Sequence, residues 1–397
     1  MDEYKYHKYV HKINKLNGGW CETLNDDERN INIVKNAEKF KFERHVRNID
    51  TDQYCIFMRK TDAHYFKILF NLKEKPIGKG AFGSVYPADM TIFNISGDIE
   101  STHKVIMKIT MKKTVKPINF CSETVSLSLI NHPNIAKYYG YFESDNNYYL
   151  FFERIIGKEL NIMVNNDSLS FDDKVRIMID LIVGFHHLHY NNIYHRDIKP
   201  ENIMIEKKNN IFVAKYIDFG FSCTQNILCN KQKIAGTPYF ISPEMVTNFN
   251  TKEIEHHDMW ALAITIMYMF TKKYMISSRS RDLAHELAKF GGNHYSIRQR
   301  INNNFSELKK YYPEYEKLIN NIIQFIEMMT CVPANTRTIP TEESINILIV
   351  DEFNSIKDKQ QSHTLLQPPQ QIQLQPPQQI QLQPQQQIQL QPLQMQK

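Results

Sequence analysis

The sequence predicts an α+β protein in which a small β-rich lobe, at about residues 65–153, is followed by a larger α-rich lobe at 154–353. Three observations predict it: short strand-like segments early in this region, one long helical repeat of apolar residues near its middle, and mostly helical patterns after that. A chain of 397 residues with 42% hydrophobic content can bury a large core, and its length suggests two or three structural units.

The elements follow in order along the chain. Strands are expected at 66–72, 84–88, 104–110 and 148–151, and a helix at 120–130. The middle helix, 171–190, carries apolar residues close to helical spacing, namely Val175, Met178, Ile179, Ile182 and Phe185. The longest apolar run, 260–270, is shorter than the roughly 20 residues that cross a bilayer, so a buried helix is expected there.

The segments on either side of this folded region carry different patterns. Residues 1–64 are polar and mixed in charge apart from one short apolar patch at 54–58, contain no motif, and are expected to be an N-terminal extension of unknown role. Residues 354–397 are expected to be a disordered tail, because a Gln- and Pro-rich octapeptide repeats three times over 367–390. Proline removes backbone donors and glutamine supplies no apolar surface, so such a tail cannot pack a core. Recruitment of partners and neutral drift both stay open as explanations.

The composition excludes several classes of protein. Forty-eight basic against forty-three acidic residues are too evenly balanced to indicate a nucleic-acid partner. The charged start, MDEYK, lacks the apolar segment of a secretory signal. We therefore expect a soluble cytoplasmic protein without nucleic-acid or membrane partners, and the oligomeric state is not predicted. Neither a zinc site nor a disulfide framework is indicated, and reduced thiols are expected, by the spacing of the six cysteines, Cys21, Cys55, Cys121, Cys223, Cys229 and Cys331.

The most informative stretch of the chain is HRDIKPEN, residues 195–202. It brings a candidate general base, Asp197, a cation, Lys199, and a metal-binding amide, Asn202, into one short loop, and Asp218 in the triplet Asp-Phe-Gly follows. Transfer of a phosphoryl group to a hydroxyl requires a proton acceptor, a lysine near the phosphates and two magnesium-binding side chains. A plain turn built from ordinary loop residues is the alternative interpretation.

A glycine-rich segment, 78–85, supports the first interpretation because it fits G-x-G-x-x-G-x-V. Glycines there let backbone amides approach phosphates with no Cβ in the way. A dinucleotide-binding fold would begin a helix after the third glycine, whereas Ser84 and its neighbours continue as a strand. Lys108, on the strand at 104–110, needs a counter-charge if it is half-buried. Glu123 is the best candidate, and two solvated surface charges are the alternative.

In order and spacing, these motifs closely resemble the eukaryotic protein kinases, and the resemblance covers about residues 65–353. It implies a bilobal protein-kinase-like fold, ATP and Mg²⁺ as cofactors, and transfer of the γ-phosphoryl group to proteins. It further implies catalytic roles for Asp197, Lys199 and Lys108, and magnesium binding by Asn202 and Asp218. The implied ATP-binding residues are Ile77, Gly78, Lys79, Gly80, Ala81, Phe82, Gly83, Ser84, Val85, Lys108, Glu123, Glu153, Ile155 and Met204.

The resemblance also implies which hydroxyls accept the phosphate. Lys199 and the segment GTPYFISPE, 236–244, are similar to those of the serine/threonine-specific kinases, in which Thr237 would position the peptide by bonding Asp197 and Lys199. Ser242 stands where the family usually has alanine. Structural roles are implied for Asp258, which would bind amides of the catalytic loop, and for Glu244, which would pair with Arg337.

Two departures from the family pattern affect nucleotide affinity and regulation. Ile106 replaces the small alanine that usually lies over the adenine, and its extra bulk is expected to alter ATP affinity. Lys233 stands where the activating phosphate is commonly attached, opposite Arg196. We therefore expect either constitutive activity or phosphorylation at Ser222 or Thr224.

Two other functions stay open at this point. A pseudokinase would keep the fold and act by docking, although such proteins usually lack equivalents of Lys108, Asp197 or Asp218, and all three are here. A small-molecule or lipid kinase is the other alternative, and the peptide-positioning segment argues against it.

Overall fold

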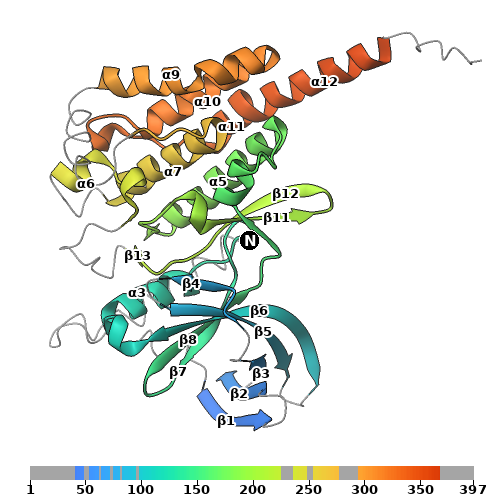
Figure 1. Ribbon diagram of the computed structural model, residues 1–397, viewed down its shortest axis with the longest axis vertical. Coiled ribbons are helices and arrows are strands. Elements are labelled where there is room, and N and C mark those ends of the chain that lie inside the picture. Colours follow the sequence, from blue (N-terminus) through green and yellow to red (C-terminus); the bar gives the residue numbers. More distant parts are fainter. Residues whose placement is uncertain are drawn as a thin grey trace, which may run out of the picture. The chain divides into compact units, whose positions relative to one another are not determined.

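The structure is a computed structural model that describes residues 41–48, 53–61, 64–71, 75–80, 83–94, 98–224, 236–247, 254–276 and 294–366. Its contacts divide the chain into two units, residues 1–353 and residues 354–397. The first unit contains both a β-sheet and a set of helices, as the predicted α+β class requires (Figure 1).

The first part of this unit is an eight-stranded antiparallel sheet with the order β1-β2-β3-β5-β6-β8-β7, in which β4 pairs with the start of β5 (Figure 1). The strands predicted at 66–72, 84–88 and 104–110 correspond to β3, β5 and β6, and β5 and β6 are much longer than expected. The strand bounds are Lys41–Asn48 (β1), Gln53–Thr61 (β2), His64–Asn71 (β3), Gly78–Gly80 (β4), Gly83–Phe93 (β5), Ile99–Met111 (β6), Tyr138–Glu143 (β7) and Asn147–Glu153 (β8).

Strands β1 and β2 lie before residue 65, where the sequence placed the start of the folded domain. β2 pairs with β3, with Ile56 opposite Ile68, and β3 pairs with the second half of β5, with Ile68 opposite Met90. The described sheet therefore begins at Lys41. No motif in the sequence predicts these two strands. Their place in the sheet depends on pairing with other segments of the chain.

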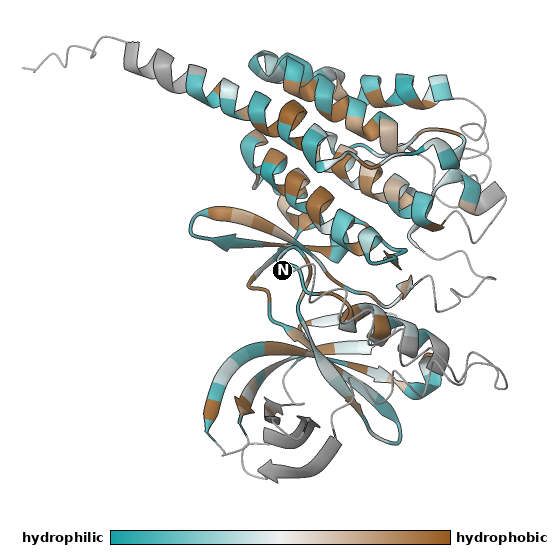
Figure 2. Cartoon of the chain, turned by 180° about the vertical axis from the view of Figure 1, so that it is seen from behind, coloured by the Kyte–Doolittle hydropathy of each residue, from teal (hydrophilic) through white to brown (hydrophobic). Residues whose placement is uncertain are grey.

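The sheet is stabilised by one face of alternating apolar residues. Hydrophobic and hydrophilic residues alternate in bands along the long curved strands (Figure 2). On the buried face, Val105 and Met107 of β6 pack with residues of neighbouring strands. The ring of Phe120, on helix α3 (Pro117–Ser128), stacks on Tyr148 of β8 with centroids 3.6 Å apart. This contact holds α3, and with it Glu123, beside the sheet.

The rest of the first unit is mainly helical. Helix α5 spans Phe171–Tyr190, as predicted, and its first turn is closed by a capping box of Ser170 and Asp173. Helix α7, Ile254–Thr271, contains the predicted apolar run and is buried almost all round. Among the described residues, this part also contains α4 (Leu160–Asn165), α6 (Pro243–Thr247), α9 (His294–Tyr311), α10 (Glu316–Met329), α11 (Glu342–Ile345) and the π-helical turn Asn346–Val350.

Two small sheets lie within this helical part and carry the loops of the candidate site. One has the order β12-β11-β9 and the other pairs β10 with β13. Their bounds are Gly157–Glu159 (β9), Ile193–Tyr194 (β10), Ile203–Lys208 (β11), Ile211–Tyr216 (β12) and Cys223–Thr224 (β13). The catalytic loop predicted at 195–202 therefore runs between β10 and β11, and the metal-binding triplet between β12 and β13.

The structure differs from two expectations, one about the C-terminal flank and one about the cysteines. Helix α12 spans Asp351–Leu366, so residues 354–366 are helical where a disordered tail was expected; they continue the helical backbone of the turn Asn346–Val350 and precede the prolines. The octapeptide repeats lie outside the described residues. Cys331 is a free thiol, but Cys223 is disulfide-bonded, so the expectation of reduced thiols is wrong for Cys223.

Within the described part of the chain, no helix is both long enough and apolar enough to cross a membrane.

Candidate active site

The catalytic loop is fixed by a buried carboxylate beneath it. Asp258, on α7, accepts hydrogen bonds from the backbone N–H groups of His195, at 2.6 Å, and Arg196, at 2.8 Å. Burial alone would raise the pKa of Asp258, but the hydrogen bond and charge of His189 outweigh it and lower that pKa. Arg196 has a φ of 66°, a strained conformation that these bonds help to hold. The predicted role of Asp258 is confirmed.

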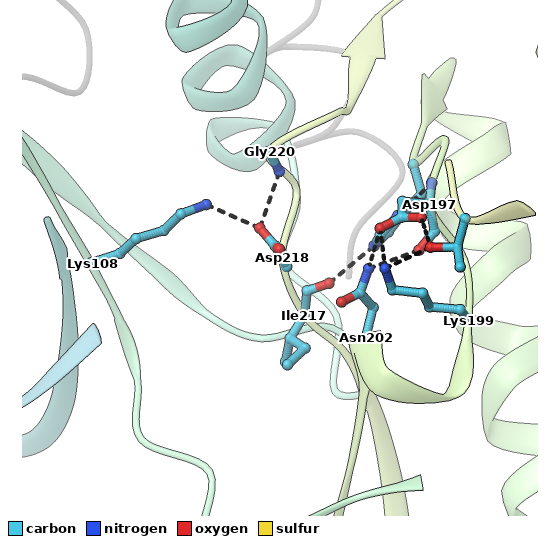
Figure 3. A network of polar contacts seen from close by, with 9 residues as sticks. Lys108, Asp197, Lys199, Asn202, Ile217, Asp218 and Gly220 are labelled. Atoms are coloured by element: carbon cyan, nitrogen blue, oxygen red, sulfur yellow. Dashed lines mark hydrogen bonds and ion pairs between the residues drawn. The ribbon is translucent and has the colours of Figure 1, made fainter. Parts of the chain in front are cut away.

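Asp197 lies at the centre of a network of donors (Figure 3). Its Oδ1 accepts a hydrogen bond from Thr237 Oγ1 at 3.0 Å, and its Oδ2 lies 2.8 Å from Lys199 Nζ. Lys199 Nζ also donates to Thr237 Oγ1, at 2.7 Å. The structure thus brings together the three residues that the sequence placed around the acceptor hydroxyl, and it holds the carboxylate of Asp197 in one orientation.

Asn202 and Asp218 supply the oxygens expected to bind metal. Asn202 Nδ2 donates to both the backbone oxygen of Asp197, at 2.8 Å, and its side chain, at 2.9 Å, so the amide oxygen points away from Asp197 (Figure 3). The Asp218 side chain is 41% exposed, and the charge of Lys108 lowers its pKa, which keeps it ionised. A carboxylate and an amide oxygen are a donor set that fits Mg²⁺, which prefers few protein oxygens together with water and phosphate.

Lys108 connects the sheet to this metal-binding side. Its Nζ lies 2.7 Å from Glu123 Oε1 and 3.0 Å from Asp218 Oδ1, and the Lys108 and Glu123 side chains are only 12% and 7% exposed. Burial alone would lower the pKa of Lys108. The charges and hydrogen bonds of the two carboxylates outweigh burial and raise that pKa, so the ammonium stays charged. The alternative of two solvated surface charges is therefore wrong.

The remaining parts of the catalytic loop and the metal triplet are also joined. His195 Nε2 lies 3.0 Å from the carbonyl oxygen of Ile217, directly before Asp218 (Figure 3). The Phe219 ring is buried 4.7 Å from the ring of His195. Asp218 has a φ of 58°, which places it in a conformation that few non-glycine residues adopt. Together these contacts hold Asp218 next to Lys108 rather than turned away from it.

The glycine-rich segment forms a hairpin between β4 and β5, with Gly78 opposite Val85 and Gly80 opposite Gly83. This agrees with the strand continuation that distinguished it from a dinucleotide-binding turn. A Cβ on Gly83 would lie 2.0 Å from the carbonyl oxygen of Ile109, so only glycine lets β5 approach the strand that carries Lys108. Ala81 and Phe82 lie outside the described residues.

Glu153 ends β8, where the adenine edge is expected, but its side chain is used elsewhere. Glu153 Oε1 lies 2.5 Å from Lys215 Nζ and accepts the N–H of Lys137 at 3.1 Å. The Glu153 side chain is therefore paired within the protein, and the nucleotide contact that the resemblance implies is one of its backbone carbonyl. Lys215 was not among the predicted site residues. Its only local signal is its place on a strand three residues before Asp218, and its partner is distant in the chain. Met204, on β11, lies opposite Lys215.

The two expected phosphorylation sites are buried. Ser222 and Thr224 are 4% and 5% exposed, and Ser122 on α3 donates to the carbonyl oxygen of Ser222 at 2.9 Å. In this conformation neither hydroxyl can enter another active site, so phosphorylation there requires the segment to open. Both sites stay predictions. Lys233 lies outside the described residues.

The predicted pair of Glu244 and Arg337 is confirmed. Arg337 Nη1 and Nη2 donate to the two carboxylate oxygens of Glu244, at 2.5 and 2.8 Å, and Nη1 also donates to the carbonyl oxygen of His256 at 2.8 Å. This two-pronged contact anchors the end of the peptide-positioning segment to the helical part.

Comparison with known proteins agrees with the resemblance to protein kinases that the motifs indicated. A family model described as protein kinase domain matches residues 72–345. Calcium-dependent protein kinase 4 of Plasmodium falciparum (isolate 3D7) is 28% identical over 274 residues, which is 66% of this chain and 46% of the relative. Calcium-dependent protein kinase 3 of Plasmodium yoelii yoelii is 31% identical over 198 residues, which is 49% of this chain and 35% of the relative. The matched region thus spans less than half the length of these relatives.

Proposed function

Because the chain belongs to the protein kinase family, we propose that it is an ATP-dependent serine/threonine kinase that transfers the γ-phosphoryl group of ATP to protein hydroxyls. The observation that carries the proposal is the placement of Lys108 Nζ between the carboxylates of Glu123 and Asp218. An ammonium held in this way, near the ends of the glycine hairpin and the metal triplet, is suited to bind phosphates.

Asp197 would receive, or at least orient, the proton of the attacking hydroxyl. Thr237 and Lys199 fix its carboxylate, so its free lone pairs can point to one acceptor position. Lys199 would at the same time place a positive charge beside the transferring phosphoryl group. These groups act by positioning and by electrostatic stabilisation, and the chemistry needs no covalent intermediate on the protein.

Asn202 and Asp218 would hold magnesium through the amide oxygen and the carboxylate. When bound, the metal neutralises phosphate charge that the protein alone compensates only in part. The Lys108 ammonium lies against Asp218 and lowers the pKa of this carboxylate, which keeps it ionised.

The nucleotide itself would be bound mostly by backbone. We propose that the glycine hairpin, 78–85, covers the phosphates, and that the carbonyl group of Glu153 and the amide of Ile155 meet the adenine edge. Ile106, which lies opposite Phe152 in the β6–β8 pairing, would contact the base and set its affinity.

A direct assay tests the proposal. The purified chain is supplied with Mg²⁺, γ-labelled ATP, and a mixture of protein, peptide and lipid substrates, with Asp197→Asn as the matched control. We expect label on serine and threonine for the wild type and a loss of orders of magnitude in the variant. A thermal shift with MgATP but no label on any substrate would point instead to a pseudokinase, and label confined to lipids would point to a lipid kinase.

Regulation of the activity can be tested in the same preparation. We propose that the enzyme is either constitutively active or phosphorylated at Ser222 or Thr224 after the segment opens. Phosphopeptide mapping of active protein is expected to find no phosphate, or phosphate at one of these two residues. Stoichiometric phosphate elsewhere on the segment between Asp218 and Glu244 would overturn this.

A further inference from the structure

Next to Asp258, α7 carries a buried histidine that the site described so far does not use. His257 Nδ1 lies 3.2 Å from Ser242 Oγ and 3.4 Å from the backbone nitrogen of Ser242. Both residues are almost completely buried. Ser242 is the residue that stands in the place of the family's usual alanine, so this departure from the pattern has a polar partner in the structure.

The protonation state of His257 follows from these contacts. Since the N–H of Ser242 points at Nδ1, this nitrogen must accept, and the ring is neutral with its hydrogen on Nε2. Burial lowers the pKa of His257; the charges of Asp258 and Glu244 oppose this, whereas those of Arg196 and Arg337 add to it. Burial and the two arginines together outweigh the two carboxylates and lower the pKa of His257, which agrees with a neutral ring.

The ring of His257 lies beside the peptide-positioning segment at two points. Its Nδ1 side meets Ser242, and its Nε2 atom would be 3.6 Å from a Cβ built on Gly236, a glycine with a φ of 114°. Between these two points the segment carries Thr237, which donates to Asp197. His257 is therefore placed to determine where Thr237 lies.

Asp258, the next residue of α7, holds the catalytic loop in a similar way. Asp258 holds the backbone N–H groups of His195 and Arg196, so two consecutive residues of α7 support the catalytic loop and the peptide-positioning segment. Because α7 is buried almost all round, it offers a rigid base for both. The distance between the base and the bound acceptor peptide would then depend on this one dipeptide.

We propose that His257 is a positioning residue for the protein substrate, acting through its hydrogen bond to Ser242, and this inference rests on the proposed kinase function. The competing interpretation is a histidine that only fills space in the core. The two differ in what they predict for variants that keep the bulk but move the acceptor atom.

The test compares His257→Asn with His257→Gln. The amide oxygen of asparagine can occupy the place of Nδ1, whereas the longer glutamine carries its oxygen near the place of Nε2 and cannot accept from Ser242. We expect His257→Gln to raise the KM for a peptide substrate about 3- to 10-fold, the effect of one lost hydrogen bond. The KM for ATP should stay unchanged in His257→Gln. In His257→Asn the KM for the peptide should stay within about 2-fold of wild type.

Ser242→Ala examines the same contact from the other partner. It removes the hydroxyl, which also hydrogen-bonds Glu244, and keeps the backbone N–H, so a smaller rise in peptide KM than in His257→Gln is expected. Equal effects of the Asn and Gln variants, or equal shifts in the KM for ATP and peptide, would overturn the inference and favour a space-filling role.

Hydrogen exchange provides a measurement that does not require turnover. The Ser242 amide is expected to exchange slowly in the wild type and in His257→Asn, and faster in His257→Gln, with exchange in α7 unchanged. A wild type that labels no serine or threonine would sink the proposed function, whereas unchanged Ser242 exchange in His257→Gln would sink this inference alone. If His257→Gln fails to fold, the Ser242→Ala variant tests the proposal instead. An unaltered peptide KM together with unaltered hydrogen exchange on the peptide-positioning segment in Ser242→Ala would overturn the proposal.

Discussion

Removal of the Arg337 side chain is expected to destabilise the folded protein strongly. The Arg337 side chain is fully buried and donates two hydrogen bonds to Glu244, whose side chain is 13% exposed. It also donates to the carbonyl oxygens of Cys331 and His256. In Arg337→Met the apolar bulk remains, but a carboxylate stays buried without its counter-charge and two carbonyl groups lose a donor.

The size of the effect follows from this geometry. Breaking one side of a buried, hydrogen-bonded ion pair typically costs about 3–5 kcal/mol. For a domain of this size each kcal/mol lowers the melting temperature by about 2–4 °C, so a decrease of about 6–20 °C is expected. Circular dichroism melts of wild type and variant, at the same protein concentration and pH 7, measure it.

The pH dependence provides a second, independent check on the cause. Burial alone would raise the pKa of Glu244, but the hydrogen bonds and charge of Arg337 outweigh it and lower that pKa from 4.5. In the wild type, this carboxylate therefore stabilises the fold above pH 4.5, and that stability is lost as pH falls through the lowered folded pKa. In Arg337→Met burial dominates and raises the pKa, so acidification from pH 7 towards 5 relieves the penalty and the two melting temperatures converge.

The double variant Arg337→Met with Glu244→Gln is the control, because it removes the buried charge together with its partner. It should recover a substantial part of the lost stability, although not the hydrogen bonds to the two carbonyl groups. A loss of less than about 1 kcal/mol in Arg337→Met would contradict the predicted cost of the buried carboxylate, and so would a double variant that is no more stable than the single one at pH 7.

Three further predictions concern the site itself. Asp218→Asn should reduce turnover by orders of magnitude and leave the circular dichroism spectrum unchanged; wild-type-like activity would refute the metal assignment. Thr237→Ala should raise the KM for a peptide about 3- to 10-fold by freeing Asp197 from one donor, while Thr237→Ser, as the control, should not. Ile106→Ala should tighten ATP binding by about 1–3 kcal/mol in calorimetry, because it removes bulk beside the adenine, and weaker binding would contradict the assigned position.

Much of the site could be predicted because its parts are local. The middle helix has the bounds that its apolar spacing predicted, and the apolar run at 260–270 lies in a buried helix. The base, the lysine and the amide of the catalytic loop lie within eight residues of chain, so their proximity is dictated by covalent geometry. The glycine hairpin follows from the same kind of short-range pattern.

Other features depend on segments that meet only when the sheet and helices pack. Lys108 and Asp218 form an ion pair although 110 positions separate them, and Lys215 and Glu153 do so across 62 positions. Strands β1 and β2 carry no motif of their own, and the burial of Ser222 and Thr224 could not be read from their polar side chains.

The amino-acid order by itself determined which chemical groups the chain carries and which of them share a loop, a strand or a helix face. The tertiary structure alone decided which charges neutralise one another, which hydroxyls are covered, and that His257 and Asp258 support two loops from one helix. The physical reason is that spacing along a chain limits distance only over a few residues, whereas ion pairing and burial depend on atoms brought together by the packing of the whole core.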